Sequence, residues 1–412
     1  MTNSLKANVF WMFIGNGLYA FMQWIQLSII AKLCSPIILG SYTLALAITA
    51  PIFLLLSLQL RALIVTDSKK EWSFSSYFIL RTVSLGISIV IVVGYILIRQ
   101  SEFKILFLIA GLKTIEGFAE IFNAQQQLME KMHYVARSLI LKGLSATISI
   151  FIGIFFFNSL PMGLIIAIFS NILVLYYNDF LNCKKLFEQE KMFYFQDLRL
   201  KSLLIKSLPL GIVMCIISLN TNISKYITEY FLGTEKQGIY STLAYCLVLG
   251  SFVNSAIGQS FSPRMSRYYL ENRKKEFKNL CIKYLSVNFG VGAILFILTI
   301  FGGYYFLKIM FSEAIASYSD LFSLIMLSGI FLYLASALGY TLTSMRIFKV
   351  QPVINGIVMI ANIIGCYFFL NRYGIYGVVY ASILAFSIQI ILTFYFICKY
   401  YDQSRTRCGT VR

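Results

Sequence analysis

Three charged side chains, Lys113, Glu116 and Glu120, lie in the middle of an otherwise apolar stretch that runs from Lys104 to Gln127. Their spacings of three and four residues place them on one face of a helix. The stretch is long enough to cross a bilayer. A charge at the bilayer centre costs about 2.5–3.5 kcal/mol even on the mildest scale. We therefore expect this charged face to point toward protein or a water-filled lumen, not toward lipid.

A second polar set lies in the stretch SLNTNISKYITEYFLG, residues 218–233. Asn222, Lys225 and Glu229 share one helical face, and the spacing of four predicts an internal ion pair between Lys225 and Glu229. The alternative is an ion pair near the outer membrane interface, with the Lys225 side chain extended toward the lipid headgroups. The spacing is compatible with both.

The predicted lumen combines two lysines with two carboxylates. Lys113 and Lys225 would attract an anionic substrate. Glu116 and Glu120 would either neutralise a lysine while the lumen is empty or take up a proton during transport.

Two more residues are candidates for the same lumen. Gln23 lies on the polar face of the first apolar run, and Arg61 ends the second run, where it could contact a phosphate. The alternative for Arg61 is an ordinary membrane-interface anchor. His133 is the chain's single histidine, so we expect no metal site and no catalytic cluster built on histidine. No cofactor is expected, although coupling to a proton or sodium gradient is compatible with the carboxylates.

The elements that must position these residues are membrane-spanning helices. Hydrophobic residues make up 58% of the 412 residues and charged residues 13%, whereas a soluble domain has about 25% charged residues. We predict an all-α polytopic membrane protein with twelve transmembrane helices in two six-helix lobes around a central lumen. The twelve apolar runs are approximately 8–31, 37–60, 76–98, 104–126, 138–157, 161–181, 207–231, 237–262, 284–306, 319–343, 352–371 and 374–397.

The distribution of basic residues predicts the orientation of the chain. The formal net charge is +18. With the N-terminus inside, 27 lysines and arginines, Arg81 and Lys142 among them, fall at the cytoplasmic ends of the runs, and six fall at the other ends. Because Lys and Arg collect on the cytoplasmic side, this ratio predicts that both termini are cytoplasmic. The membrane orientation also accounts for the net positive charge of the chain. We therefore do not expect nucleic acid as a partner.

A weak internal repeat supports the two lobes. Gly40-x-Tyr42 and Gly238-x-Tyr240 occur at corresponding places in the two halves. We predict an N-terminal lobe at 1–182, a cytoplasmic linker at 183–206 that forms an amphipathic surface helix, a C-terminal lobe at 207–398 and a cytoplasmic tail at 399–412.

The pattern resembles the polysaccharide flippases of the multidrug/oligosaccharidyl-lipid/polysaccharide exporter superfamily, of the O-antigen kind. The resemblance rests on LG-x-Y-xx-A after the first run, QG-x-Y after the seventh, SLNTNISKYITEYFLG before it and YGIYGVVYA in the last run. It implies two bundles around a V-shaped, cationic lumen. It also implies export of an undecaprenyl-pyrophosphate-linked oligosaccharide across a bacterial inner membrane, with a polysaccharide polymerase and a chain-length regulator as candidate protein partners.

Two other functions compete with a flippase. A multidrug or cation antiporter of the same superfamily would favour acidic residues in the lumen, and the lysines argue against it. A membrane enzyme such as a polymerase or acyltransferase would need a catalytic set in a loop. The single histidine and the short outer loops argue against an enzyme.

Overall fold

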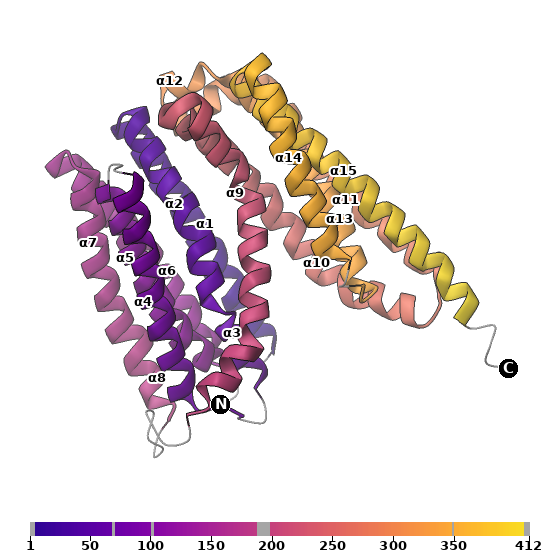
Figure 1. The fold of residues 1–412 in the computed structure, drawn as a ribbon, viewed down its shortest axis with the longest axis horizontal. Helices are drawn as coiled ribbons and strands as arrows, with labels where there is room; N and C mark the ends of the chain where they lie inside the picture. Colours follow the sequence, from indigo (N-terminus) through magenta and orange to yellow (C-terminus); the bar gives the residue numbers. More distant parts are fainter. Residues whose placement is uncertain (1–4, 68–70, 100–102, 188–197, 348–349, 408–412) are drawn as a thin grey trace. The chain divides into compact units, whose positions relative to one another are not determined.

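The computed structural model describes residues 5–67, 71–99, 103–187, 198–347 and 350–407, which are almost wholly helical and contain no strand (Figure 1). Among these residues, nine helices are long and apolar enough to cross a membrane. Helix α5 (Phe103–Leu128) is not one of the nine, because its apolar stretch contains three charged residues, Lys113, Glu116 and Glu120. The predicted all-α membrane fold is confirmed, whereas the number of twelve spans and the central lumen stay predictions.

The chain forms two compact units, Met1–Leu219 and Asn220–Arg412. The boundary lies inside α9, which begins at Leu200. Unit 1 therefore includes the start of the segment 207–231. Of the predicted linker, residues 188–197 lie outside the described residues, as do 408–412 of the predicted tail. The predicted lobe boundaries stay predictions.

The helices of unit 1 are α1 (Leu5–Leu33), α2 (Pro36–Ser57), α3 (Leu60–Thr66), α4 (Phe74–Arg99), α5, α6 (Met132–Phe157), α7 (Leu160–Val174), the π-helix η1 (Leu175–Phe180), α8 (Leu181–Lys185) and the first part of α9 (Leu200–Tyr245). Unit 2 holds the rest of α9, α10 (Leu247–Leu270), α11 (Lys274–Met310), α12 (Glu313–Ala316), α13 (Ser319–Ser344), α14 (Gln351–Tyr373) and α15 (Ile375–Arg407).

Helix boundaries follow local sequence signals. The Ser35 hydroxyl accepts a hydrogen bond from the Ile38 amide at the start of α2, and Pro36 follows it in the first turn. Ser159 caps α7 in the same way. The first amides of a helix have no acceptor within the helix. A serine at the N-cap accepts a hydrogen bond from one of them, and a proline in the first turn has no N–H that needs an acceptor. Inside α9, Gly233 has φ +81° and interrupts the helix. Glycine adopts this conformation at no steric cost, and the break lies between the predicted seventh and eighth runs.

Small residues allow the helices of unit 1 to pack closely. A Cβ on Gly153 of α6 would lie 2.1 Å from the backbone of Gly163 of α7. A Cβ on Gly15 of α1 would lie 2.7 Å from the Cα of Ala136 of α6. Close backbone approach through small residues is how helices associate in lipid, where apolar burial gives no driving force. Helix α6 is therefore held between α1 and α7.

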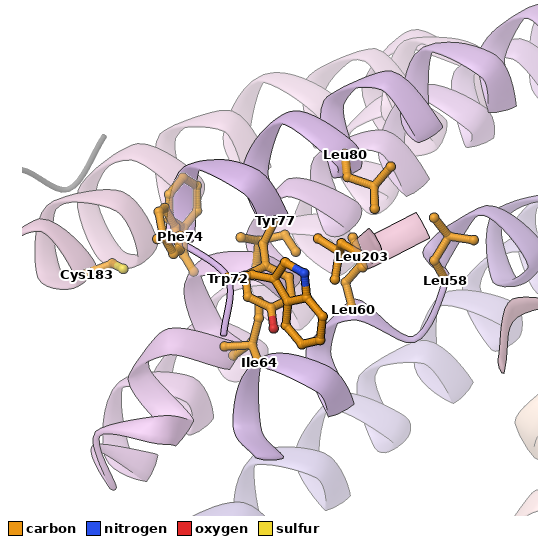
Figure 2. Packing of buried hydrophobic residues seen from close by; sticks show 12 residues of the cluster. Leu58, Leu60, Ile64, Trp72, Phe74, Tyr77, Leu80, Cys183 and Leu203 are labelled. Carbon is orange, nitrogen blue, oxygen red and sulfur yellow. The ribbon is translucent and has the colours of Figure 1, made fainter. Parts of the chain in front are cut away.

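A buried cluster joins the first turns of α9 to the rest of unit 1 (Figure 2). Trp72 and Tyr77 pack in it with Leu60 and Ile64 of α3, and Leu203 of α9 is fully buried there. Lys206, one turn later, places its ammonium 4.5 Å from the centre of the Trp72 ring. The cluster explains why the start of α9 belongs to unit 1.

Unit 2 is organised around α13. The Tyr333 hydroxyl donates a hydrogen bond to the Leu247 carbonyl at 2.9 Å, and a Cβ on Gly250 would lie 2.2 Å from the Tyr333 ring. Tyr284 of α11 is also fully buried and donates to the Asn254 side chain at 2.7 Å. Tyrosine hydroxyls thus fasten α10 to both α11 and α13.

Candidate functional site

Helix α5 provides the polar face at the centre of the candidate site in unit 1. The Lys113 ammonium donates to one Glu116 oxygen at 2.6 Å, and the Tyr19 hydroxyl of α1 donates to the other at 3.0 Å. The Gln23 side chain contacts the same Tyr19 hydroxyl. The Lys113 and Glu116 side chains remain 27% and 37% exposed. The predicted charged face of α5 therefore contacts polar groups of neighbouring helices.

Glu120, one turn further along α5, is paired with Arg81 of α4. The Arg81 guanidinium also donates to the Gly117 carbonyl at 2.9 Å, and its side chain is 4% exposed, against 39% for Glu120. Gly117 makes room for this approach, because a Cβ there would lie 3.3 Å from an Arg81 nitrogen. Arg81 is therefore a buried partner of the candidate site, and its placement on the cytoplasmic side stays a prediction.

Arg61 of α3 lies at the far end of the same face. Its guanidinium donates twice to the Gln127 side-chain oxygen, at 3.1 and 2.9 Å. In the described part of the chain it forms no ion pair, although it lies within electrostatic range of Glu120. Because its bonded partner is neutral, Arg61 keeps a charge that an anion could neutralise.

A buried ion pair that the helical spacings do not predict lies beside this face. The Lys142 ammonium of α6 lies 2.5 Å from an Asp179 carboxylate oxygen and 2.8 Å from the Ser138 hydroxyl. The Lys142 and Asp179 side chains are 6% and 0% exposed. Lys142 is therefore a buried charge, and its placement on the cytoplasmic side stays a prediction. The signal that could have revealed the pair is Asp179 itself, a carboxylate inside the apolar run 161–181.

Asp179 is positioned by the π-helix η1. A π turn holds one residue more than an α turn and is often found at functional sites. The Asn178 amide donates to the second Asp179 oxygen at 3.0 Å, and the Gln126 amide of α5 donates to the Asp179 carbonyl at 3.1 Å. The ion pair is therefore bonded to the helix that carries the candidate site, and Lys142 lies within electrostatic range of Glu116.

The polar set of unit 2 differs from the prediction. The Lys225 ammonium donates to the Asn222 side-chain oxygen at 3.0 Å, not to Glu229. The predicted Lys225–Glu229 ion pair is therefore wrong. Asn222 lies one turn before Lys225 on α9 and is buried, so its side-chain oxygen accepts a hydrogen bond from the ammonium away from water. Ser224, next to Lys225, accepts a hydrogen bond from Asn362 of α14 at 3.1 Å.

The structure brings Gln23, Arg61, Lys113, Glu116 and Glu120 to one face of unit 1. Asn222, Lys225 and Glu229 lie in unit 2, so a lumen shared by the two lysines stays a prediction.

The charges of the unit 1 site do not cancel. Among the charged side chains whose contacts are described above, the cations Arg61, Arg81, Lys113 and Lys142 accompany the carboxylates Glu116, Glu120 and Asp179. One positive charge is in excess. Such a site is suited to an anionic group, since an unneutralised charge away from water is costly.

Comparison with known proteins identifies the family. A family model described as polysaccharide biosynthesis protein matches residues 5–269, and a second, described as MatE, matches residues 209–368. The capsular polysaccharide biosynthesis protein CapF of Staphylococcus aureus is 26% identical over 392 residues, which cover 94% of this chain and 98% of CapF.

Solved structures share the fold. A lipid II flippase MurJ in an inward closed conformation superimposes with a TM-score of 0.73 at 15% identity, covering 94% of this chain and 87% of MurJ. An inward-facing multidrug resistance MATE family transporter gives 0.69 at 13% identity, covering 98% and 96%. The first of these proteins is named as a flippase and the second as a transporter. The chain belongs to the polysaccharide biosynthesis protein family.

Proposed function

We propose that this protein moves an undecaprenyl-pyrophosphate-linked oligosaccharide, an O-antigen or related repeat unit, across a bacterial inner membrane by alternating access. The observation that carries the proposal is the excess positive charge along α5, where Arg61, among the described residues, is hydrogen-bonded to the neutral Gln127 and to no carboxylate. A pyrophosphate is the anionic part of such a lipid, and planar guanidinium groups suit phosphate oxygens.

Substrate binding would then be an exchange of partners. Without substrate, Glu116 holds Lys113 and Glu120 holds Arg81. The pyrophosphate binds Arg61 first and then competes with Glu116 for the partly exposed Lys113 ammonium. Two unit charges 4 Å apart interact by about 4 kcal/mol at an effective dielectric constant of 20. Each ion pair that is broken or formed in this exchange therefore changes the energy of the site by a similar amount. The prenyl chain stays in the lipid throughout.

The same carboxylates offer a route to ion coupling. A carboxylate that loses its cationic partner to the substrate becomes easier to protonate. We propose Glu116 or Glu120 as the group that carries a proton, or that binds sodium, on the return step. Lys225, Asn222 and Glu229 of unit 2 are further candidate substrate-binding residues.

Arg61 provides the first test of this function. We expect Arg61→Gln to reduce surface glycan in a deletion strain about tenfold, and Arg61→Lys to restore part of it, because a charged hydrogen bond contributes roughly 1.5–3 kcal/mol. The assay follows surface glycan and cytoplasmic lipid-linked intermediates at matched protein levels.

Arg372→Gln is the matched control for Arg61→Gln, because Arg372 is exposed at the end of α14. Full surface glycan in the Arg61→Gln strain, without accumulated intermediates, would contradict the proposal.

A multidrug or cation antiporter is the second candidate. The observation that favours it is the match of the MatE model to residues 209–368, together with two partly exposed carboxylates, Glu116 and Glu120. Drug-sensitivity profiles separate the two candidates. An antiporter deletion sensitises cells to cationic drugs and leaves the glycan intact, whereas a flippase deletion does the reverse.

A further inference from the structure

A groove of about 320 Å³ opens on unit 1 between α6 and the segment formed by α7, η1 and α8. It does not belong to the charged face of α5. Its lining combines apolar side chains, amides, a tyrosine and one cation: Arg137, Leu141, Leu173, Val174, Tyr177, Asn178 and Asn182.

The groove follows from the way α6 and α7 pack. The two helices are closest where Gly153 meets Gly163. At the opposite end of the pair, the π turn of η1 directs Asn178 inward, 95% buried, and leaves Tyr177 65% exposed. The groove lies at this end, between side chains of α6 and those of η1 and α8.

The surroundings of the groove are apolar and exposed. From Arg137, a stripe of α6 at spacings of three and four continues through Leu141, Leu144, Ile148, Phe151 and Phe155. Ile148, Phe151 and Phe155 are 55%, 40% and 59% exposed, and Phe169 of α7 is 64% exposed. In a membrane protein, such side chains face acyl chains.

The same stripe gives the depth of Arg137. It lies eighteen residues from Phe155, or about 27 Å at 1.5 Å per residue. The hydrocarbon core is about 30 Å thick. Arg137 is therefore at the level of the lipid headgroups when Phe155 lies near the opposite interface.

Arg137 supplies a positive charge for a lipid phosphate. It is exposed, it is the one charged residue among the described residues that line the groove, and it forms no ion pair with another described residue. The hydroxyl of the exposed Tyr177 is an additional hydrogen-bond donor. The Asn182 amide donates to the Asn178 carbonyl at 2.7 Å and keeps a second N–H. The apolar residues Leu141, Leu173 and Val174 lie beside them.

We propose that this groove binds an anionic phospholipid of the surrounding bilayer, with its phosphate at Arg137 and an acyl chain along Leu141, Leu173 and Val174. The single cation suits one phosphodiester better than a pyrophosphate, so the occupant is not the transported lipid. Asn178 contacts both the groove and Asp179. A bound phospholipid therefore supports the π turn that holds the buried Lys142–Asp179 pair.

The test is native mass spectrometry of the purified full-length protein in detergent, titrated with dioleoylphosphatidylglycerol or dioleoylphosphatidylcholine. We expect Arg137→Gln to weaken the tightest phosphatidylglycerol binding about fivefold, in line with about 1 kcal/mol for a basic residue near anionic lipid, and to leave phosphatidylcholine binding unchanged. Arg267→Gln is the matched control, since Arg267 is exposed on α10 of unit 2. We expect it to bind like the unsubstituted protein.

A second variant tests the apolar part of the groove. Leu173→Trp fills it and should remove the same lipid, whereas Leu298→Trp, at an exposed position of α11, should not. Equal lipid loss in Arg137→Gln and Arg267→Gln would overturn the proposal, as would unchanged binding in both groove variants. Preference of the Arg137 site for undecaprenyl phosphate over phosphatidylglycerol would also overturn it.

Discussion

The Lys142–Asp179 pair is the most deeply buried charge pair among the described residues, with both side chains at most 6% exposed. Removing one member leaves the other charged and buried, which costs about 3–5 kcal/mol. We therefore expect Asp179→Asn to lower the melting temperature of the purified protein clearly. The measurement is thermal unfolding in detergent.

The control for Asp179→Asn is Glu313→Gln. Its pair with Lys308 has side chains 72% and 48% exposed, and exposed pairs contribute about 0–1 kcal/mol. We expect Glu313→Gln to change the melting temperature little. The double variant Lys142→Met/Asp179→Leu should recover stability, because it removes both buried charges. Equal stability of Asp179→Asn and the unsubstituted protein would show that the pair is not formed.

The contacts of the charged residues could be predicted only where their spacing along the sequence was informative. Lys113, Glu116 and Glu120 recur at helical intervals, and that periodicity correctly predicts a charged face directed at polar partners. Arg81 and Lys142 lie about two and three turns inside their helices. Charge counting cannot distinguish such residues from charges at the membrane surface. The partner of Lys225 could not be predicted from spacing either. Its ammonium donates to the Asn222 side-chain amide oxygen and not to the expected Glu229 carboxylate.

At the scale of elements, the contact between α6 and α7 rests on two glycines. A side chain on Gly153 would collide with the Gly163 backbone, which cannot move aside as a flexible side chain can. We expect Gly153→Leu to lower the amount of folded protein several-fold, measured by size-exclusion chromatography of a fluorescent fusion.

Gly302→Leu in α11 is the matched control, because a Cβ there has no atom within 4 Å. We expect normal folded protein from it. Similar yields from both variants would mean that α6 and α7 are not closely packed.

Most helices could be predicted from apolar runs, but their irregularities could not. The break at Gly233 lies between two predicted runs. The π turn at Leu175–Phe180 has no sequence signal of its own, because its backbone is set by packing of Asp179 against α5 and α6. The apolar runs also do not predict that α9 belongs to both units. Leu203 near its start packs in the buried cluster of unit 1, and the helix continues into unit 2.

At the scale of the whole molecule, the distribution of basic residues predicts the orientation. Excluding the buried Arg81 and Lys142 leaves a large cytoplasmic excess, so both termini should be cytoplasmic. We expect a green fluorescent protein fused after Arg412 to fluoresce. Alkaline phosphatase fused at Asn158, between α6 and α7, should be active because it is exported. The reverse pattern would invert the orientation and place Arg61 on the outer side.

The central claim is that the cationic face of α5 binds the pyrophosphate of a lipid-linked glycan. The most direct measurement is flipping of undecaprenyl-pyrophosphate-linked oligosaccharide in proteoliposomes that contain the full-length protein. We predict flipping that falls at least tenfold in Arg61→Gln and Lys113→Gln and stays normal in Arg372→Gln. Unchanged flipping in the first two variants, or none by the unsubstituted protein with its native lipid-linked glycan, would contradict the account.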